Sequence, residues 1–589
     1  MTKILLLQHD LDPLAMGIPS LTKHLSQYTE TVVLSGNSIT PGGPPHIRSV
    51  VIDGPSLVYH VYYRLLAWAD IAYDALDIQP TCDVVSRGVV SFLLQFNDQG
   101  VEIHQICFDG ALPISKRATR LARIEKSRQK LEFCRQRPIL PTANRHRKAT
   151  PIQPAQIWQR RHLPSRWKNL PENPFMVSAV YEDLTNRWSK KLMVTTIHPC
   201  ASQLEGEYPW AKITTMVPGE ADLDCARITK LTGSAVLTND SDLAVHDLGQ
   251  HGALVLLNSL EFLDDTPDLI SSEIRGLKIH PHEICVRLGI ASLQRFAYEL
   301  TQDPHRGFSD LVRRSKQDLE AESVIGFNEF LQEYLDNPDQ HTSLRDIPSA
   351  LTLDPRVSEL FWQYKLPETY CWGEEIEPHI YLGILPEDHA RQCAWEQGRI
   401  YRALGYSLLN LAQPTNRQFS AIHEFVRRGR RIVPEQVTLS RVKTIASDLD
   451  LLSRRLHLAR SVFGGATQPS FWVMFALSEI YRNSSSNTTI PSAGKLEHFL
   501  AHGFAGKSSE WADLHLLAQI HAVLYSLRML KQLLGVTQNL DLSRQHQDIL
   551  NELPPLHLLV VCRHDVMKGF VGVPSIHESV SQLFQTYGS

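Results

Sequence analysis

The chain has 589 residues and a formal net charge of −4, and this length predicts two or three domains. Its 43% hydrophobic and 21% charged residues exclude a fibrous or mostly disordered protein, and no apolar run reaches the roughly 20 residues that a membrane span needs. Nine singly scattered cysteines without zinc-like spacing, and a start without a signal peptide, predict reduced thiols in the nucleus or cytoplasm and no membrane partner.

Two apolar, β-branched runs are predicted strands, and each ends at an aspartate. Residues 49–52 lead into Asp53, and residues 104–108 lead into Asp109. The segment between them, residues 84–96, has apolar side chains at helical spacing, so the predicted order is strand, helix, strand, with a parallel sheet. Parallel sheets bind ligands at the carboxyl ends of their strands, which is where both aspartates are expected.

The segment that follows, residues 116–168, is strongly basic. It contains 16 Lys and Arg but only two acids, Glu125 and Glu132, so it carries +14 and leaves −18 for the rest of the chain. Such an imbalance favours a polyanionic partner over a uniformly solvated surface. A charged, flexible insertion is the alternative.

A third unit follows the basic segment. Residues 192–197 are a predicted strand, residues 219–231 a helix, and residues 235–238 another strand that leads into Asp240 and Asp242. Carboxylates placed repeatedly beyond strand ends are typical of one chelating cluster assembled from distant segments. Any single one could equally be a helix cap or a turn residue.

The pattern changes beyond about residue 300. Residues 442–462 and 514–534 keep apolar side chains at three- and four-residue spacing, which predicts amphipathic core helices without a cofactor. Residues 483–494 are a predicted polar linker, and no solenoid repeat is present. We expect residues 301–589 to be a mainly α-helical region that could bind a protein partner.

Five motifs, in order along the chain, resemble the flap endonuclease and XPG nuclease superfamily, and most closely its Asteroid branch. They are MGIPSL at 16–21, VVIDGPSLVY at 50–59, ICFDGALPISKRATRLAR at 106–123, VPGEADLDCA at 217–226 and AVLTNDSDL at 235–243. The resemblance implies a PIN-like α/β fold, a parallel sheet flanked by helices. The domains expected are an extension at 1–15, a nuclease domain at 16–300 with a basic insertion at 111–170, and the helical region at 301–589.

By position, six acids match the metal-binding residues of this superfamily: Asp53, Asp109, Glu220, Asp222, Asp240 and Asp242. The resemblance implies Mg²⁺ or Mn²⁺, with two ions, and a nuclease that hydrolyses phosphodiesters in DNA or RNA. Two hard cations about 4 Å apart can activate water and neutralise the leaving oxygen, and such cations prefer oxygen ligands. We therefore read the acids as a metal site.

The spacing within each acidic pair predicts where the pair lies. Asp240 and Asp242 can face one site from an extended turn, whereas Glu220 and Asp222 would diverge on an ideal helix. The second pair is therefore expected at a helix start, with one member bound indirectly. Asp224 is a possible substitute.

Basic residues in the matching region gain a role from the resemblance. Lys116 and Arg123 match catalytic residues on a helix beside the scissile phosphate, and their seven-residue spacing puts them on one helical face. With Arg120 and Lys130 they could form a stripe for backbone phosphates. Gly17 matches a glycine beside the active centre, where it would contact the nucleic acid.

Two departures favour a second reading. Ala291 and Ser292 stand where the resemblance expects a seventh acid, and the glycine-rich turn that should follow, in a duplex-binding helix-two-turn-helix element, is missing. A catalytically inactive, Asteroid-like scaffold for nucleic acid or protein is therefore the alternative to a nuclease.

Overall fold

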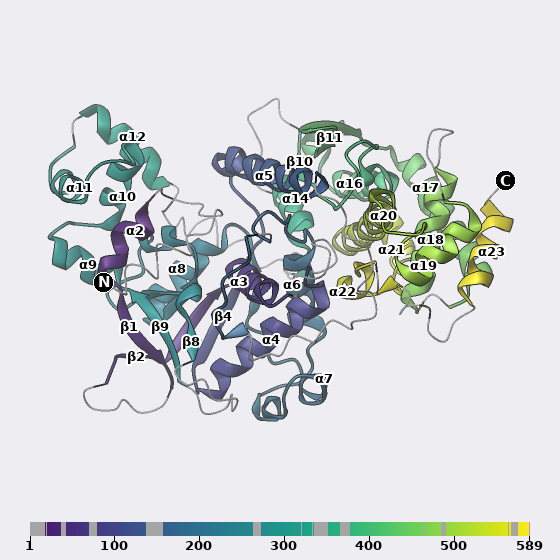
Figure 1. The fold of residues 1–589 in the computed structure, drawn as a ribbon. Helices are drawn as coiled ribbons and strands as arrows, with labels where there is room; N and C mark the ends of the chain where they lie inside the picture. Colours follow the sequence, from purple (N-terminus) through teal and green to yellow (C-terminus); the bar gives the residue numbers. More distant parts are fainter. Residues whose placement is uncertain are drawn as a thin grey trace.

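The computed structural model describes most of the chain, in segments separated by short gaps (Figure 1). The described residues are 18, 20–36, 43–69, 79–136, 157–165, 167–262, 273–319, 321–332, 334, 352–365, 377–465, 467–483, 491–563, 565, 566, 570 and 575–587. The extension at 1–15, Gly17, residues 137–156 of the basic insertion and most of the predicted linker lie outside them. No helix in the described segments is long and apolar enough to cross a membrane.

A nine-stranded sheet forms the centre of the N-terminal half. Its order is β2-β1-β9-β7-β6-β3-β4-β5, with β8 paired to β9, and the neighbours from β7 to β5 are all parallel. The strands are β1 (Glu30–Leu34), β2 (His46–Ile47), β3 (Ser49–Asp53), β4 (Glu102–Asp109), β5 (Thr214–Val217), β6 (Ala235–Thr238), β7 (Ala253–Leu256), β8 (Glu261–Phe262) and β9 (Ile274–Ile279). The predicted α/β fold with a largely parallel sheet is confirmed.

Helices cover both faces of this sheet because its strands are apolar on both sides. On β3, Val50 and Ile52 belong to one core cluster and Val51 to another, as the two-residue period of a strand requires. The first face carries α3 (Gly54–Ala67), α4 (Cys82–Asp98) and α6 (Met176–Asn186), and the second carries α2 (Leu21–Leu25), α8 (Ala221–Thr232), α9 (Pro281–Leu288), α10 (Leu293–Gln302) and α11 (Phe308–Ser315). The predicted helices at 84–96 and 219–231 are thus confirmed as α4 and α8.

The predicted strand at 192–197 is wrong. These residues lie mostly in helix α7 (Lys190–Thr196), where the Ser189 hydroxyl accepts a hydrogen bond from the N–H of Leu192 and caps the helix. Only Met193 is buried, so one face packs inward instead of alternate residues. The strand that pairs with β4 on the side away from β3 is β5, about twenty residues later in the sequence.

Helices flank Ala291 and Ser292, the residues that stand where the resemblance expects a seventh acid. Ser292 caps α10 by accepting a hydrogen bond from the N–H of Arg295. On α10, Glu299 is buried and pairs with three arginines, Arg295, Arg306 and Arg314, at 2.7 to 3.1 Å. With α9, α11 and α12 (Ala321–Gln332), this segment forms a helical lobe beside α2 (Figure 1). The buried acid of this lobe is thus engaged by arginines.

The C-terminal half is mainly helical, as predicted, and contains a small sheet that the sequence pattern did not predict. The sheet joins β10 (His379–Tyr381), β11 (Ala421–Arg428) and β12 (Arg431–Thr438). The main helices of the C-terminal half are α14 (Pro355–Lys365), α16 (Arg399–Leu411), α17 (Val442–Phe463), α18 (Pro469–Arg482), α19 (Ala493–His502), α20 (Trp511–Val536), α21 (Asp541–Gln545), α22 (Leu556–Leu559) and α23 (Ile576–Tyr587). The predicted core helices at 442–462 and 514–534 are confirmed as α17 and α20.

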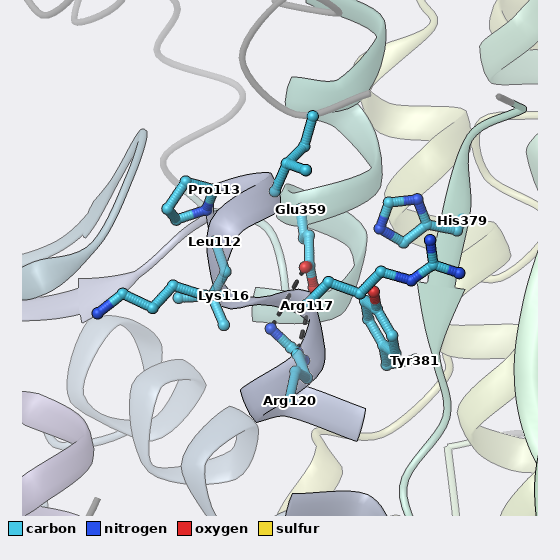
Figure 2. Close-up of a pocket in the computed structure, with 9 residues that line it drawn as sticks. Leu112, Pro113, Lys116, Arg117, Arg120, Glu359, His379 and Tyr381 are labelled. Carbon is cyan, nitrogen blue, oxygen red and sulfur yellow. Dashed lines mark hydrogen bonds and ion pairs between the residues drawn. The ribbon is translucent and has the colours of Figure 1, made fainter. Parts of the chain in front are cut away.

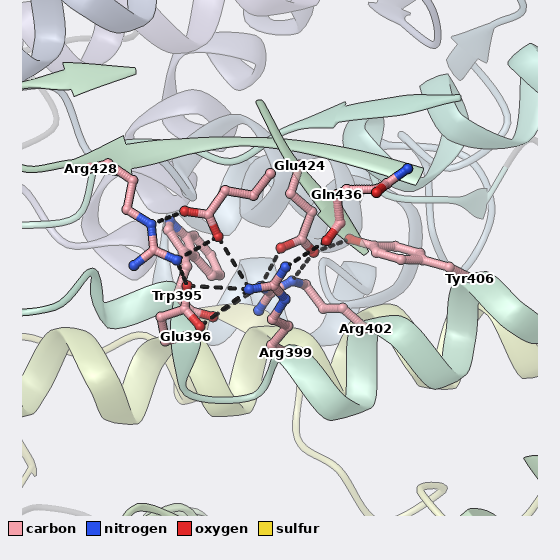
Figure 3. A network of polar contacts seen from close by, with 9 residues as sticks. Trp395, Glu396, Arg399, Arg402, Tyr406, Glu424, Arg428 and Gln436 are labelled. Atoms are coloured by element: carbon pink, nitrogen blue, oxygen red, sulfur yellow. Dashed lines mark hydrogen bonds and ion pairs between the residues drawn. The ribbon is translucent and has the colours of Figure 1, made fainter. Parts of the chain in front are cut away.

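A buried ion pair attaches the small sheet to these helices (Figure 3). Arg402 on α16 donates to Glu424 on β11 at 2.6 and 2.8 Å, and both side chains are nearly inaccessible to solvent. The same guanidinium donates to the Ser526 hydroxyl on α20, and the Tyr406 hydroxyl donates to Glu424. Because removing one partner would leave a buried charge unpaired, this network fixes the small sheet against α16 and α20.

Candidate metal centre and nucleic-acid interface

Strand register brings the predicted acids to one edge of the large sheet. Asp53, the last residue of β3, lies level with Cys107 of β4, and Asp109 follows two residues later. On the other side of β3, Ile52 pairs with Leu237, so the end of β6 reaches the same edge. The strands are parallel, and their carboxyl ends therefore meet where the sequence predicted them to meet.

Asp53 is held by hydrogen bonds from two neighbouring elements. Its Oδ1 accepts from the N–H of Ser56 at 3.1 Å, which caps α3, and its Oδ2 accepts from the Thr238 hydroxyl at 2.7 Å. Burial raises the pKa of Asp53 to about 6, with the Asp109 charge adding to it and these hydrogen bonds opposing it. Ser56 and Thr238 thus orient the carboxylate.

Asp109 ties the end of β4 to the start of α8. Its Oδ1 accepts a hydrogen bond from the N–H of Ala221 at 2.7 Å. Burial raises the pKa of this carboxyl, while the Ala221 N–H and the positive charges of Arg123, Arg120 and Lys116 lower it in part. These cations act on Asp109 from the basic helix.

The predicted extended turn holds for Asp240 alone, because Asp242 lies in the first turn of a 3-10 helix. Asp240 caps a short 3-10 helix, Ser241–Val245, by accepting from the N–H of Asp242 at 2.9 Å. The Asp242 carboxylate accepts from the N–H of Ile18 at 2.8 and 3.0 Å. Gly17 itself lies outside the described residues, but its neighbour Ile18 is anchored at this turn.

Asp222 has the strongest electrostatic link to the other acids. Glu220 immediately precedes α8 and Asp222 lies in its first turn, so the predicted position at a helix start is confirmed. The pKa of Asp222 is raised well above its usual value, first by burial and then by four neighbouring carboxylates: Asp240, Asp53, Glu220 and Asp109. Asp224, the suggested substitute, is buried and pairs with Arg227 at 2.6 Å instead.

The cluster is an all-oxygen donor set that suits a hard divalent cation. Carboxylates that raise one another's pKa also gain the most from a cation between them. No three acids of this cluster bring carboxylate oxygens within 4.8 Å of one another in the described residues. The one group of three candidate ligands that does so among the described residues is Asp98, His198 and Cys200. Two ions would occupy a wider space than one.

The predicted basic residues divide into two groups. Lys116 and Arg123 face the cluster: the Lys116 ammonium lies 3.7 Å from Glu220, and the exposed Arg123 lowers the pKa of Asp109 and Asp240. Lys130, by contrast, is buried and pairs with Glu172. Its expected role in phosphate binding stays a prediction.

Helix α5 (Arg117–Arg135), which carries Arg123, is also attached to the C-terminal half. Arg120 pairs with the buried Glu359 of α14 at 3.1 Å and lies 5.0 Å above the Tyr381 ring (Figure 2). Arg117 lies 5.1 Å above the Phe425 ring. At the far end of α5, Arg135 pairs with Asp388 at 2.7 Å, and Glu132 pairs with Arg430 at 2.9 Å. Both ends of α5 therefore rest on the C-terminal region.

A small pocket lies between α5 and this region. It is lined by Leu112, Pro113, Ile114, Lys116, Arg117, Arg120, Glu359, His379 and Tyr381 (Figure 2). Burial, with Arg117 and Arg120, lowers the pKa of His379 to about 3, so this ring is neutral. The lining is therefore positively charged, with a single paired carboxylate.

Comparison with known proteins agrees with this architecture. Residues 172–439 match the family described as XPG domain containing, and this match supports a relation to the XPG nuclease superfamily. It includes four of the acids, Glu220, Asp222, Asp240 and Asp242, and ends at the close of β12. No curated protein matches the chain.

Two aspartates of α8 are expected to affect stability in opposite directions. In a chelator, Asp222→Asn should stabilise the protein by on the order of 1 kcal/mol, because it removes a charge that its neighbours oppose. Asp224→Asn should destabilise it, since it breaks the contact with Arg227. Thermal unfolding of the three proteins in EDTA measures both effects. A wild-type protein more stable than Asp222→Asn would contradict the repulsion between the acids.

Proposed function

We propose that this chain is a divalent-metal-dependent nuclease that hydrolyses phosphodiester bonds in DNA or RNA. One observation carries the proposal: Asp222 is surrounded by the charges of Asp240, Asp53, Glu220 and Asp109 at the sheet edge, and the cations of α5 face the same point. Acids for metal and cations for phosphate are the two requirements of such a reaction.

In this proposal the residues have distinct tasks. Asp53, Asp109, Glu220, Asp222, Asp240 and Asp242 would hold two Mg²⁺ or Mn²⁺ ions, which supply water activation and charge neutralisation when bound. Lys116 and Arg123 would hold the scissile phosphate, while the Thr238 hydroxyl keeps the Asp53 carboxylate oriented. Arg120 would act mainly as a support for α5, because Glu359 already engages it.

The wider biological setting is also proposed. The nucleic acid would approach along α5, with Gly17 near the strand, and the chain would belong to the Asteroid branch. The helical region beyond residue 439, which the family match does not include, could bind a protein partner. An intracellular site of action, with a role such as DNA repair, fits a nuclease.

A catalytically inactive scaffold is the second candidate, and two contacts favour it. Ser292, at the place of the expected seventh acid, serves as a helix cap. Lys116 forms an ion pair with Glu220, so one ligand candidate is already neutralised. A scaffold of this kind would bind nucleic acid without cleaving it.

Cleavage should depend on both the acids and the metal. Purified full-length protein is expected to cut flap, bubble or single-stranded substrates with Mg²⁺ or Mn²⁺, and Asp240→Asn should lose at least 100-fold in rate while keeping its helix cap. Thr238→Val should lose less, since it removes the hydroxyl that orients the Asp53 carboxylate and accepts from the N–H of Asp240 but leaves every acid in place. If the wild type cuts no substrate with either metal, or Asp240→Asn cuts as fast as the wild type, the chain is a catalytically inactive scaffold instead of a nuclease.

Nucleic-acid affinity should depend on the two cations that face the cluster. The double variant Lys116→Glu with Arg123→Glu should bind all sequences more weakly, and its salt slope should fall by about 0.7 to 0.9 per lost phosphate contact. The matched control is Lys443→Glu with Lys495→Glu, two exposed lysines on α17 and α19. If the double variant and the wild type have equal affinity and equal salt dependence, the basic segment is not part of the nucleic-acid-binding surface.

A further inference from the structure

A second group of metal-ligand side chains lies at the opposite end of the large sheet. Asp98 is the last residue of α4, shortly before β4 begins, and His198 and Cys200 lie at the start of the 3-10 helix Pro199–Gln203. Because β4 runs eight residues from there to Asp109, the two groups are separated by roughly 20 Å. The trio is therefore distinct from the acidic cluster.

The three side chains already converge. A carboxylate oxygen of Asp98, a ring nitrogen of His198 and the sulfur of Cys200 lie within 4.8 Å of one another, and all three residues are partly exposed. Around a tetrahedral ion with bonds of about 2.0 to 2.3 Å, such atoms stand roughly 3.5 Å apart. A shift of about 1 Å per side chain would therefore suffice, and partly exposed side chains can make it.

Two features prepare the group for a cation. The Oδ2 atom of Asp98 is buried without a hydrogen-bond partner among the described residues, while the Cys200 thiol interacts with the same carboxylate. The His198 ring is oriented by the N–H of Cys200, which donates to its Nδ1 at 3.2 Å. An ion at Nδ1 would replace this long hydrogen bond, and an ion at Nε2 would replace a proton.

The donor types indicate which metal would bind. One oxygen, one nitrogen and one sulfur make a borderline-soft set that favours zinc-type transition metals, whereas Mg²⁺ requires oxygen ligands. We propose that Asp98, His198 and Cys200 form a transition-metal site, selective for Zn²⁺ over Mg²⁺, that clamps the end of α4 to the segment before β5. Three protein ligands leave a fourth position for water.

The sequence pattern gave no sign of this site. The cysteines were read as reduced thiols because none has a second cysteine or a histidine at zinc-like spacing. His198 and Cys200 are two residues apart, and the third ligand comes from about one hundred residues earlier. Only the packing of α4 against the 3-10 helix brings them together.

Cobalt provides a direct test because a thiolate bound to Co²⁺ gives a charge-transfer band in the near ultraviolet. Titrating Co²⁺ into metal-free, reduced, full-length protein should produce this band with one equivalent. Zn²⁺ should abolish it, and a large excess of Mg²⁺ should not. Cys200→Ser should lose the band, and Asp98→Asn should weaken Co²⁺ binding at least tenfold.

Two controls make the result specific. Cys285→Ser removes another partly exposed thiol and should keep the band, and Asp240→Asn should keep it as well, which separates this site from the proposed nuclease centre. If Cys200→Ser unfolds, His198→Gln replaces it as the test variant. Absence of the band in the wild type, or a band that survives the loss of Cys200 or His198, would overturn the proposal and leave the nuclease proposal unaffected.

Discussion

Mutual repulsion among the carboxylates at the edge of the large sheet is the constraint on which the N-terminal half depends. Two like charges 4 Å apart cost about 4 kcal/mol at an effective dielectric constant of 20, and each hydrogen bond to a charged group returns about 1.5 to 3 kcal/mol. The fold supplies such bonds individually, from Thr238 to Asp53, from the Ala221 N–H to Asp109 and from the Asp242 N–H to Asp240. The repulsion energy and the hydrogen-bond energy are comparable, so nearby cations decide whether the clustered carboxylates destabilise the fold.

Helix α5 brings those cations and depends on the C-terminal half for its position. Its Arg123 faces the acids, whereas Arg117 and Arg120 are engaged by α14 and the small sheet through Glu359, Tyr381 and Phe425. The family match runs from residue 172 to residue 439 and so includes this support but not the helices beyond it. Among the later helices, α20 is linked to this region by the hydrogen bond from Arg402 to the Ser526 hydroxyl.

Local sequence predicted the parts of this fold that local chemistry determines. Strands that end at Asp53, Asp109 and Thr238 were predicted because buried parallel strands are short, apolar and β-branched. The strand predicted at 192–197 failed because the Ser189 cap and a single buried side chain favour a helix, which overrides β propensity.

The sequence pattern did not predict which side chains from distant segments pair with the basic residues of α5. The sequence indicated that Arg120 faces phosphates, yet Glu359, more than two hundred residues away, pairs with it. Lys130 was placed in the same stripe, although the helix turns it towards Glu172. Asp53, Asp109, Asp240 and Asp242 could be predicted because they follow parallel strands that share an edge, whereas Glu220 and Asp222 were identified from the resemblance.

The most direct test of this account is a crystal structure of the full chain soaked in Mn²⁺, with anomalous scattering used to locate the ion. The account predicts at least one anomalous peak bridging carboxylates of Asp53, Asp109, Asp222 and Asp240, lost in crystals of Asp240→Asn. An empty cluster in wild-type crystals, with Mn²⁺ bound only to exposed acids such as Asp541, would contradict it.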